Sequence, residues 1–281
     1  MMEALARFGI DISTNLGIFA VCGLYSFLVV TVIWAIGLAQ GNHSLMDGYY
    51  GFGYAIPGWI AFLLSGASSQ TAALLLLMVS LHGCRLGVYL GLRWRRLVKT
   101  PIGGDPRYIG FKKKLFHGYW WKSFFAVMHS QTLVIMIVGI PSVWGIAAAA
   151  EVRDDFGWLT AIGMLVFGVG FYFETVADAQ LQAFKAEPAN KGRYLNTGVW
   201  THSRHPNYFG TTTVWWGMYL VAVSAVPGIW WTIIGPLVNT YMLAGVTGSP
   251  MTDRIMGDRP EYQALIARTR AFLPIPKAWS K

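Results

Sequence analysis

Long apolar stretches separated by short polar segments follow one another along nearly the whole chain of 281 residues. A helix that crosses a bilayer needs about 20 apolar residues. On this pattern we expect an all-α, polytopic integral membrane protein with seven transmembrane helices, the second shorter than the others. Gly139-Ile140-Pro141 predicts a kink within the fourth. The expected spans cover about 16–39, 54–66, 71–92, 124–150, 157–180, 208–223 and 228–246.

The composition agrees with this class, since 54% of the residues are hydrophobic and only 12% are charged, against about 25% charged in soluble domains. We expect one membrane-embedded domain over 1–281. Cys22 and Cys84 both lie inside apolar runs, which excludes a disulfide framework and a zinc site of ordinary spacing, so no metal is expected. Gly168-Val169-Gly170 follows no strand pattern, which excludes a Rossmann dinucleotide fingerprint. The N-terminus lacks a basic region, so we expect no cleavable signal peptide.

The basic residues behind the formal net charge of +9 gather between the apolar spans. This distribution follows the positive-inside rule and does not suggest a nucleic-acid partner. The most basic segment, 93–122, should face the cytoplasm, which places the N-terminus outside and the C-terminus inside. The segments 41–53 and 174–206 then share the cytoplasmic side with the tail from Met251, as in a bacterial inner-membrane protein whose site faces the cytoplasm. Within the basic segment, anionic headgroups are the expected neighbours of Lys112, Lys113 and Lys114.

The stretch from Gly198 to Gly210 is the strongest candidate for a site. It places two histidines, an arginine, an asparagine and a tyrosine directly before an apolar run from Val214 to Ile234. Removing so many polar groups from water costs several kcal/mol unless a partner satisfies them. A bound polar ligand is one explanation. An interfacial loop in contact with water and lipid headgroups is the other.

Two helical faces add further candidates. His82, Arg85 and Tyr89 share one face of the third span, where Arg85 faces a polar cavity or extends to the interface. Glu174 and Asp178 share a face at the end of the fifth span, and two carboxylates in this arrangement are ordinarily a solvated surface.

These segments resemble the bacterial steroid 5-alpha-reductase-like membrane family, the DUF1295 group. The resemblance covers most of the chain beyond Asp47. It rests on Phe173-Glu174, Ala177-Asp178-Ala179-Gln180-Leu181 with Phe184, Pro188-Ala189-Asn190, Gly198-Val199-Trp200, Ser203-Arg204-His205-Pro206-Asn207-Tyr208-Phe209-Gly210, Arg85-Leu86-Gly87-Val88-Tyr89 with Arg93, Asp105-Pro106-Arg107-Tyr108, and Tyr262 with Arg268-Thr269 and Phe272-Leu273-Pro274.

The resemblance implies a seven-helix reductase that takes NADPH from the cytosol and delivers hydride to the β-carbon of an α,β-unsaturated ketone. The substrate would be a steroid or another lipid that enters from the bilayer. Arginines suit the phosphates of this cofactor, while carboxylates either accept from ribose hydroxyls or hold arginines in place. The cofactor contacts expected on this basis are Arg85, Arg93, Arg107, Tyr108, Glu174, Asp178, Lys185, Arg193, Tyr194, Arg204, His205, Asn207, Tyr208 and Arg268.

The catalytic prediction concerns the group that stabilises charge on the substrate carbonyl oxygen and protonates the product. We assign this role to His82 and Tyr89, with Asp47 or Tyr49 completing the pocket from the first loop between the helices. His82 has an alternative role as an interhelical hydrogen-bonding group.

Two observations keep other functions open. Thr211 stands where the family usually has a glutamate, which favours an inactive lipid-binding homologue. Arg204-His205-Pro206 and Tyr208 also occur in integral membrane methyltransferases of the isoprenylcysteine carboxyl type, which use S-adenosylmethionine. Those enzymes usually carry adjacent glutamates in the tail, where this chain has only Glu261 beside Pro260.

Overall fold

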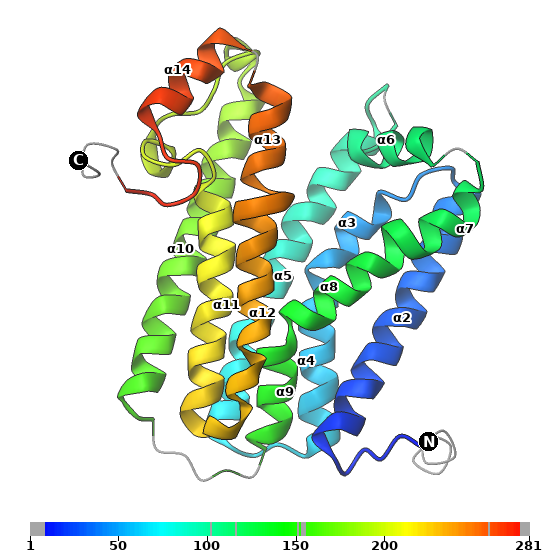
Figure 1. Ribbon diagram of the computed structural model, residues 1–281, viewed down its shortest axis with the longest axis vertical. Coiled ribbons are helices and arrows are strands. Elements are labelled where there is room, and N and C mark those ends of the chain that lie inside the picture. The colour runs from blue at the N-terminus through cyan, green and yellow to red at the C-terminus, as the bar shows by residue number, and fades with distance from the viewer. Residues whose placement is uncertain are drawn as a thin grey trace. The chain divides into compact units, whose positions relative to one another are not determined.

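A computed structural model describes residues 9–101, 103–115, 117–150, 152, 156–257 and 259–275. Within these ranges the regular secondary structure is helical, apart from one isolated parallel bridge between Ser203 and Arg270. The prediction of an all-α protein is therefore confirmed for the described part of the chain (Figure 1).

The helices group into two compact units. Unit 1 consists of Met1–Phe156 and Ala222–Thr232, and unit 2 of Gly157–Val221 and Ile233–Lys281. Residues 222–232 belong to unit 1 and include the end of helix α11 (Pro206–Ala225) and most of the 3-10 segment η4 (Pro227–Ile233). The residues directly before and after them belong to unit 2. The prediction of one domain for the whole chain stays a prediction.

The first helix among the described residues of unit 1 is long, and its first turn is capped by Thr14, which accepts from the Gly17 amide. The next two helices are nearly continuous, because Gly51 between them keeps helical dihedral angles. Ser69 caps α5 (Gln70–Val98) in the same way as Thr14 caps α2 (Asn15–Ala39). The elements of unit 1 are α2 (Asn15–Ala39), α3 (Leu45–Tyr50), α4 (Phe52–Ser65), α5 (Gln70–Val98), α6 (Pro106–Lys114), α7 (Tyr119–Ser123), the π-helix η1 (Phe124–His129), α8 (Ser130–Val138) and α9 (Ile140–Ala148), with the 3-10 segment η4 (Pro227–Ile233) reaching into it.

Glycine brings α3 and α4 close to α5. A Cβ atom at Gly51 would lie 2.1 Å from the amide nitrogen of Gly87, and one at Gly87 would lie 2.7 Å from the ring of Phe52. No side chain fits between these backbones. The close approach buries Asp47 of α3 and His82 of α5.

Unit 2 is built around two helices that also approach through glycine. Gly163 and Gly170 on one helix face Gly217 and Gly210 on the other, so that a Cβ atom at Gly170 would lie 2.8 Å from the carbonyl oxygen of Gly210. The elements are α10 (Trp158–Ala186), the 3-10 turns η2 (Pro188–Asn190) and η3 (Gly198–Trp200), α11 (Pro206–Ala225), α12 (Ile234–Tyr241), the π-helix η5 (Met242–Val246), α13 (Ser249–Met256) and α14 (Pro260–Arg268). Figure 1 shows α10, α11 and α12 running side by side.

Five segments are long and apolar enough to cross a membrane: Asn15–Ala39, Gln70–Val98, Tyr119–Val138, Trp158–Ala186 and Pro227–Met251. The second and sixth predicted spans are not among them, because α4 has only 14 residues and α11 begins with a polar segment. The predicted kink is confirmed as a break at Gly139 between α8 and α9. The seventh predicted span is not a regular α-helix, since it passes from 3-10 through α to π geometry.

Candidate functional site

A cavity of about 310 Å³ opens in unit 2 between the loop after α10 and helix α14. We call it the cationic cavity, because its walls carry three basic side chains and one carboxylate. Its volume lies at the lower end of the range for small-molecule pockets, about 300–1,000 Å³. The lining residues are Lys191, Gly192, Arg193, Tyr194, Asn196, Glu261, Leu265 and Arg268.

The loop side of this cavity follows from how α10 ends. Asn190 donates from Nδ2 to the carbonyl oxygen of Phe184 at 3.0 Å, which satisfies a group that the helix leaves open. Gly192 adopts a positive φ of 85°, a conformation that other residues rarely adopt. The turn leaves Lys191 and Arg193 exposed on either side of this glycine.

The helix side is held by a tyrosine pair. The ring of Tyr262, in the first turn of α14, lies 5.0 Å from the ring of Tyr194. The Tyr262 hydroxyl donates to Asp253 at 2.6 Å. Glu261 and Arg268 lie at the two ends of the same helix. The cavity is therefore formed by a turn and a short helix that are joined through buried aromatic and polar contacts.

Arg204 holds α13 and the end of α14. Its Nε and Nη2 atoms donate to the two carboxylate oxygens of Asp253 at 3.1 and 2.6 Å, and Nη1 donates to the carbonyl oxygen of Thr269 at 2.8 Å. Burial raises the pKa of Asp253, but the hydrogen bonds from Arg204 and Tyr262 outweigh it and lower that pKa overall. Arg204, predicted as a cofactor contact, lies buried in this ion pair.

The chain after α14 packs beside the same stretch. The Arg204 amide donates to the carbonyl oxygen of Arg270 at 2.9 Å, and the Arg270 amide donates to that of His202 at 3.1 Å. The Ser203 hydroxyl donates to the carbonyl oxygen of Phe272 at 2.8 Å. Several polar groups of residues 202–204 therefore form hydrogen bonds with the segment after α14.

His205 and Tyr208, both predicted as cofactor contacts, lie against each other. Their rings are stacked with centroids 5.0 Å apart and an interplanar angle of 6°. Burial lowers the pKa of His205 to about 4, assisted by Arg204 and opposed by Asp253, whose carboxylate lies 3.9 Å from Nε2. His205 is therefore neutral at pH 7.

Glu174 and Asp178 share a face of α10 as predicted, but that face is not solvated. The two residues are 0% and 5% exposed. Thr211 donates to Glu174 at 2.7 Å, and Asn207 donates from Nδ2 to Asp178 at 3.1 Å. The close approach of Gly210 to α10 produces both pairs, since a Cβ atom there would lie 2.3 Å from the Glu174 amide nitrogen. The sequence alternative of a solvated carboxylate surface is therefore wrong.

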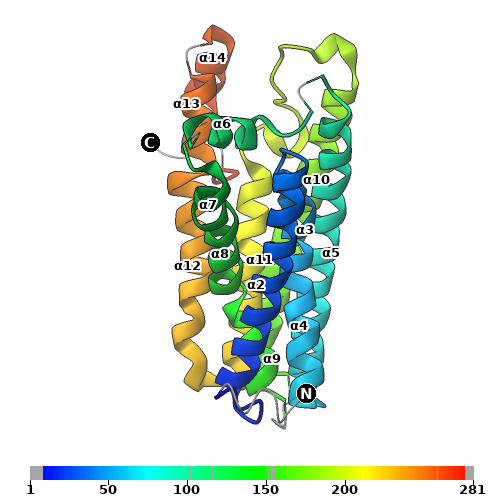
Figure 2. The same cartoon turned by 90° about the vertical axis from the view of Figure 1, so that its right-hand side faces the viewer.

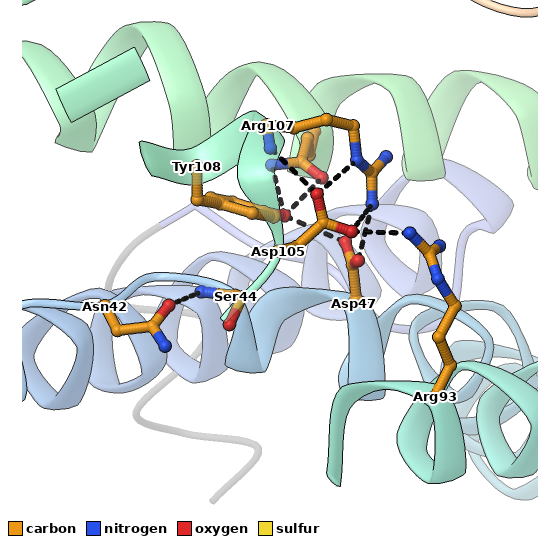
Figure 3. Close-up of polar contacts among 8 residues, drawn as sticks. Asn42, Ser44, Asp47, Arg93, Asp105, Arg107 and Tyr108 are labelled. Carbon is orange, nitrogen blue, oxygen red and sulfur yellow. Dashed lines mark hydrogen bonds and ion pairs between the residues drawn. The ribbon is translucent and has the colours of Figure 1, made fainter. Parts of the chain in front are cut away.

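Unit 1 contains a second polar group, which we call the loop cluster: Asp47, Arg93, Asp105, Arg107 and Tyr108 (Figure 3). Arg107 donates to Asp47 at 2.6 Å and to Asp105 at 3.0 Å, and Arg93 donates to Asp105 at 2.5 Å. The Tyr108 hydroxyl donates to Asp47 at 3.0 Å. Burial raises the pKa of Asp105, but the hydrogen bonds and the charge of Arg107 outweigh this effect and lower that pKa overall.

The remaining predicted catalytic residues lie on α5. His82 is fully buried, with its ring 6.1 Å from that of Tyr54. The guanidinium of Arg85 lies 5.5 Å from the ring centre of Tyr89, a cation–π geometry. Both belong to unit 1, together with Asp47 and Tyr49.

Three predicted cofactor contacts, Arg193, Tyr194 and Arg268, line the cationic cavity, and Lys185 is exposed in the last turn of α10. Lys191, Asn196 and Glu261 also line the cavity but were not predicted as site residues. The sequence does point to Lys191, because Lys191 and Arg193 flank a glycine just after the end of a helix. Glu261 and Asn196 carried none, since their place depends on α14 packing against the loop.

Comparison with known proteins gives a family match and two relatives. The family described as "Protein of unknown function (DUF1295)" matches residues 33–269. An uncharacterised protein of Schizosaccharomyces pombe is 24% identical, over 94% of this chain and 82% of its own length. A protein of Ustilaginoidea virens named "Probable O-methyltransferase ustE" is 33% identical over 69 residues, which cover 25% of this chain and 24% of that protein. No solved structure matches the chain.

Proposed function

The chain belongs to the DUF1295 family, and from this premise and the charge of the cationic cavity we propose that it is an NADPH-dependent membrane reductase. Its reaction would reduce the C=C bond of an α,β-unsaturated ketone in a steroid-like or other lipid. The cofactor supplies the hydride, and the protein supplies binding, alignment and a donor for the carbonyl oxygen.

The observation that carries the proposal is the charge of the cavity. Lys191, Arg193 and Arg268 against Glu261 leave two net positive charges around about 310 Å³. NADPH carries a pyrophosphate and a 2′-phosphate, and arginine binds such groups through planar, paired donors. Tyr194 adds an aromatic wall. We therefore assign the cavity to a phosphate-bearing part of the cofactor.

The buried pairs of unit 2 fit a supporting role. Asn207 is held by Asp178 and Thr211 by Glu174, so these polar side chains are fixed at the start of α11. A group that is already oriented loses little entropy when a ligand binds. We keep Asn207 and Tyr208 as cofactor contacts, and His82, Tyr89 and Asp47 as the groups that serve the substrate carbonyl.

The proposal includes the seven-span topology, with the N-terminus outside and the cavity facing the cytoplasm of a bacterial cell. The five apolar segments support it. For the second span, predicted over 54–66, we propose that the helix begins earlier, because α3 and α4, with 6 and 14 residues, join through helical Gly51 into 21 residues, about 31 Å at 1.5 Å per residue. The 20 residues of α11 supply the sixth.

The test measures NADPH binding to the detergent-purified protein through the change in its thermal unfolding temperature. NADPH should raise the unfolding temperature in a concentration-dependent way, because a ligand that binds only the folded state stabilises it. The double variant Arg193→Gln/Arg268→Gln should lose this effect, with NADPH affinity reduced at least about a hundredfold for two charged hydrogen bonds of about 1.5–3 kcal/mol each. Arg254→Gln, an exposed arginine that does not line the cavity, is the control. No stabilisation of the wild type by NADPH would refute the cofactor assignment.

A second candidate is an S-adenosylmethionine-dependent membrane methyltransferase. The 69-residue match to the Ustilaginoidea virens protein favours it. The cavity opposes it, because a sulfonium cation gains nothing from three basic neighbours. Stabilisation by S-adenosylmethionine and not by NADPH would select this function. Stabilisation by neither would favour an inactive lipid-binding protein.

A further inference from the structure

Helix α6 has the orientation of a helix that lies in a membrane surface. It runs across the direction of α2 and α5 rather than along it (Figure 2). Its N-terminus is capped by Asp105, which accepts from the Arg107 amide at 2.9 Å. Arg107 and Tyr108 then fasten the helix to Asp47 of α3. The first turn of α6 is therefore firmly held.

The last turn of α6 carries a different set of groups. Lys112, Lys113 and Lys114 follow one another and are exposed. Lys112 has a neighbour in the protein, the Gly41 carbonyl oxygen at 3.4 Å from Nζ. The ion pairs of this region use Arg93 and Arg107, so Lys113 and Lys114 present positive charge directly to the surroundings.

Exposed indole rings lie on α7, the next helix along the chain, which contacts α6. Trp120 and Trp121 of α7 are 63% and 46% exposed. Lys122 places its ammonium 5.6 Å from the Trp121 ring centre. Tryptophan is enriched where a membrane meets water, because one edge of the ring is polar and the rest is apolar.

The surface becomes apolar along the same helical segment. Phe125 and Leu133, which follow in η1 and α8, are 64% and 62% exposed. A partner that covers both regions must be negatively charged at one end and apolar at the other. Nucleic acid or a soluble acidic peptide offers only the first property, whereas a phospholipid with an anionic head offers both.

We propose that the α6–α7 surface, formed by Lys113, Lys114, Trp120, Trp121 and Lys122, binds the headgroup of an anionic phospholipid. The acyl chains lie along the exposed apolar side of η1 and α8. Because α6 is tied to α3 and α5 through the loop cluster, an occupied surface stabilises unit 1. This proposal does not depend on the cofactor.

The experiment titrates the full-length protein in a nonionic detergent with dioleoylphosphatidylglycerol, and separately with dioleoylphosphatidylcholine, while thermal unfolding is followed. The anionic lipid should raise the unfolding temperature, and less so in high salt, which screens exposed charges. The variant Lys113→Gln/Lys114→Gln should need about thirtyfold more phosphatidylglycerol for half of the maximal rise in unfolding temperature, because each basic residue contributes about fivefold to the affinity. Arg254→Gln/Arg259→Gln removes the same charge from exposed positions in unit 2 and should match the wild type.

A second variant keeps the charge and removes the indole. Trp120→Ala should also weaken the effect of the anionic lipid, while its unfolding temperature without lipid stays close to that of the wild type, since the Trp120 ring is largely exposed. The proposal is overturned if phosphatidylcholine stabilises as strongly as phosphatidylglycerol, if the lysine and control variants respond alike, or if inorganic phosphate reproduces the full effect.

Discussion

The loop cluster of unit 1 and the cationic cavity of unit 2 use the same residue types to different ends. In the loop cluster two arginines meet two aspartates, so the formal charges cancel. In the cavity two arginines and a lysine meet a single glutamate. A cation whose donors are bound by carboxylates holds the fold, whereas a cation beside an open volume is available to a ligand.

Arg204 shows that the distinction operates within unit 2 as well. In the sequence it lies between Arg193 and Arg268, which both line the cavity, yet its guanidinium donates to Asp253 and Thr269. We therefore base the proposed division between structural and ligand-binding arginines on their carboxylate partners and not on their position in a motif.

The largest expected effect comes from Arg204→Ala. Removal of one partner from a buried ion pair costs about 3–5 kcal/mol, because the remaining charge is left without compensation. Chemical unfolding should show this loss, and Arg204→Lys should restore only part of the stability, since lysine lacks the fork that binds both carboxylate oxygens. Unchanged stability with abolished NADPH binding would instead identify Arg204 as a cofactor-binding residue.

Asp105→Asn should have the next largest effect. Asp105 accepts from Arg93 and Arg107 and caps α6. The arginine side chains are 39% and 45% exposed, so solvent screens part of the interaction, and we expect a loss of about 2 kcal/mol. NADPH affinity should not change. A large change in affinity with intact stability would mean that the loop cluster binds the ligand.

Acid should destabilise both units through one buried histidine each. Burial lowers the pKa of His205 to about 4, and burial together with Lys112 lowers that of His43 to about 4. The unfolded chain binds these protons near pH 6.5, before the folded protein does. Stability therefore falls as the pH drops from about 6.5 toward 4, by about 1 kcal/mol per histidine between pH 7 and 5.5. His205→Phe should flatten the pH dependence of unfolding, and an unaltered profile would contradict the assignment.

The smallest expected effect concerns the carboxylate of the cationic cavity. Glu261→Gln removes the carboxylate from the described lining of the cavity and raises the local net charge from two to three. We expect NADPH affinity to rise about two- to threefold, because an exposed charge contributes about 0.2–1 kcal/mol. Glu187→Gln, which neutralises an exposed carboxylate outside the cavity lining, is the matched control. Weaker binding by Glu261→Gln would indicate that Glu261 itself contacts the cofactor.

Much of the helical structure was predictable. The first helix was expected over 16–39 and occupies Asn15–Ala39. Helix α5 runs to Val98, beyond the expected end at 92, because Arg95 and Arg96 end the apolar pattern but favour a helix C-terminus. Span seven was less predictable, since it passes from the 3-10 segment η4 through α12 to the π-helix η5, a change of helix geometry that its hydrophobicity does not indicate.

The candidate site was only partly predictable. Arg193, Tyr194 and Arg268 were named from the sequence and line one cavity. The partner of Arg204 was not predicted, because Asp253 lies 49 residues away and outside any shared motif. The burial of Glu174 was also missed, since it results from the approach of Gly210 on another helix.

The helical class, the position of most helices and the inventory of charged groups follow from the amino-acid sequence alone. These depend on hydrophobic periodicity and on hydrogen bonds between residues a few positions apart. The folded chain is needed to see which cations meet a carboxylate and which face an open volume. That choice depends on contacts between segments distant in sequence, which local patterns do not encode.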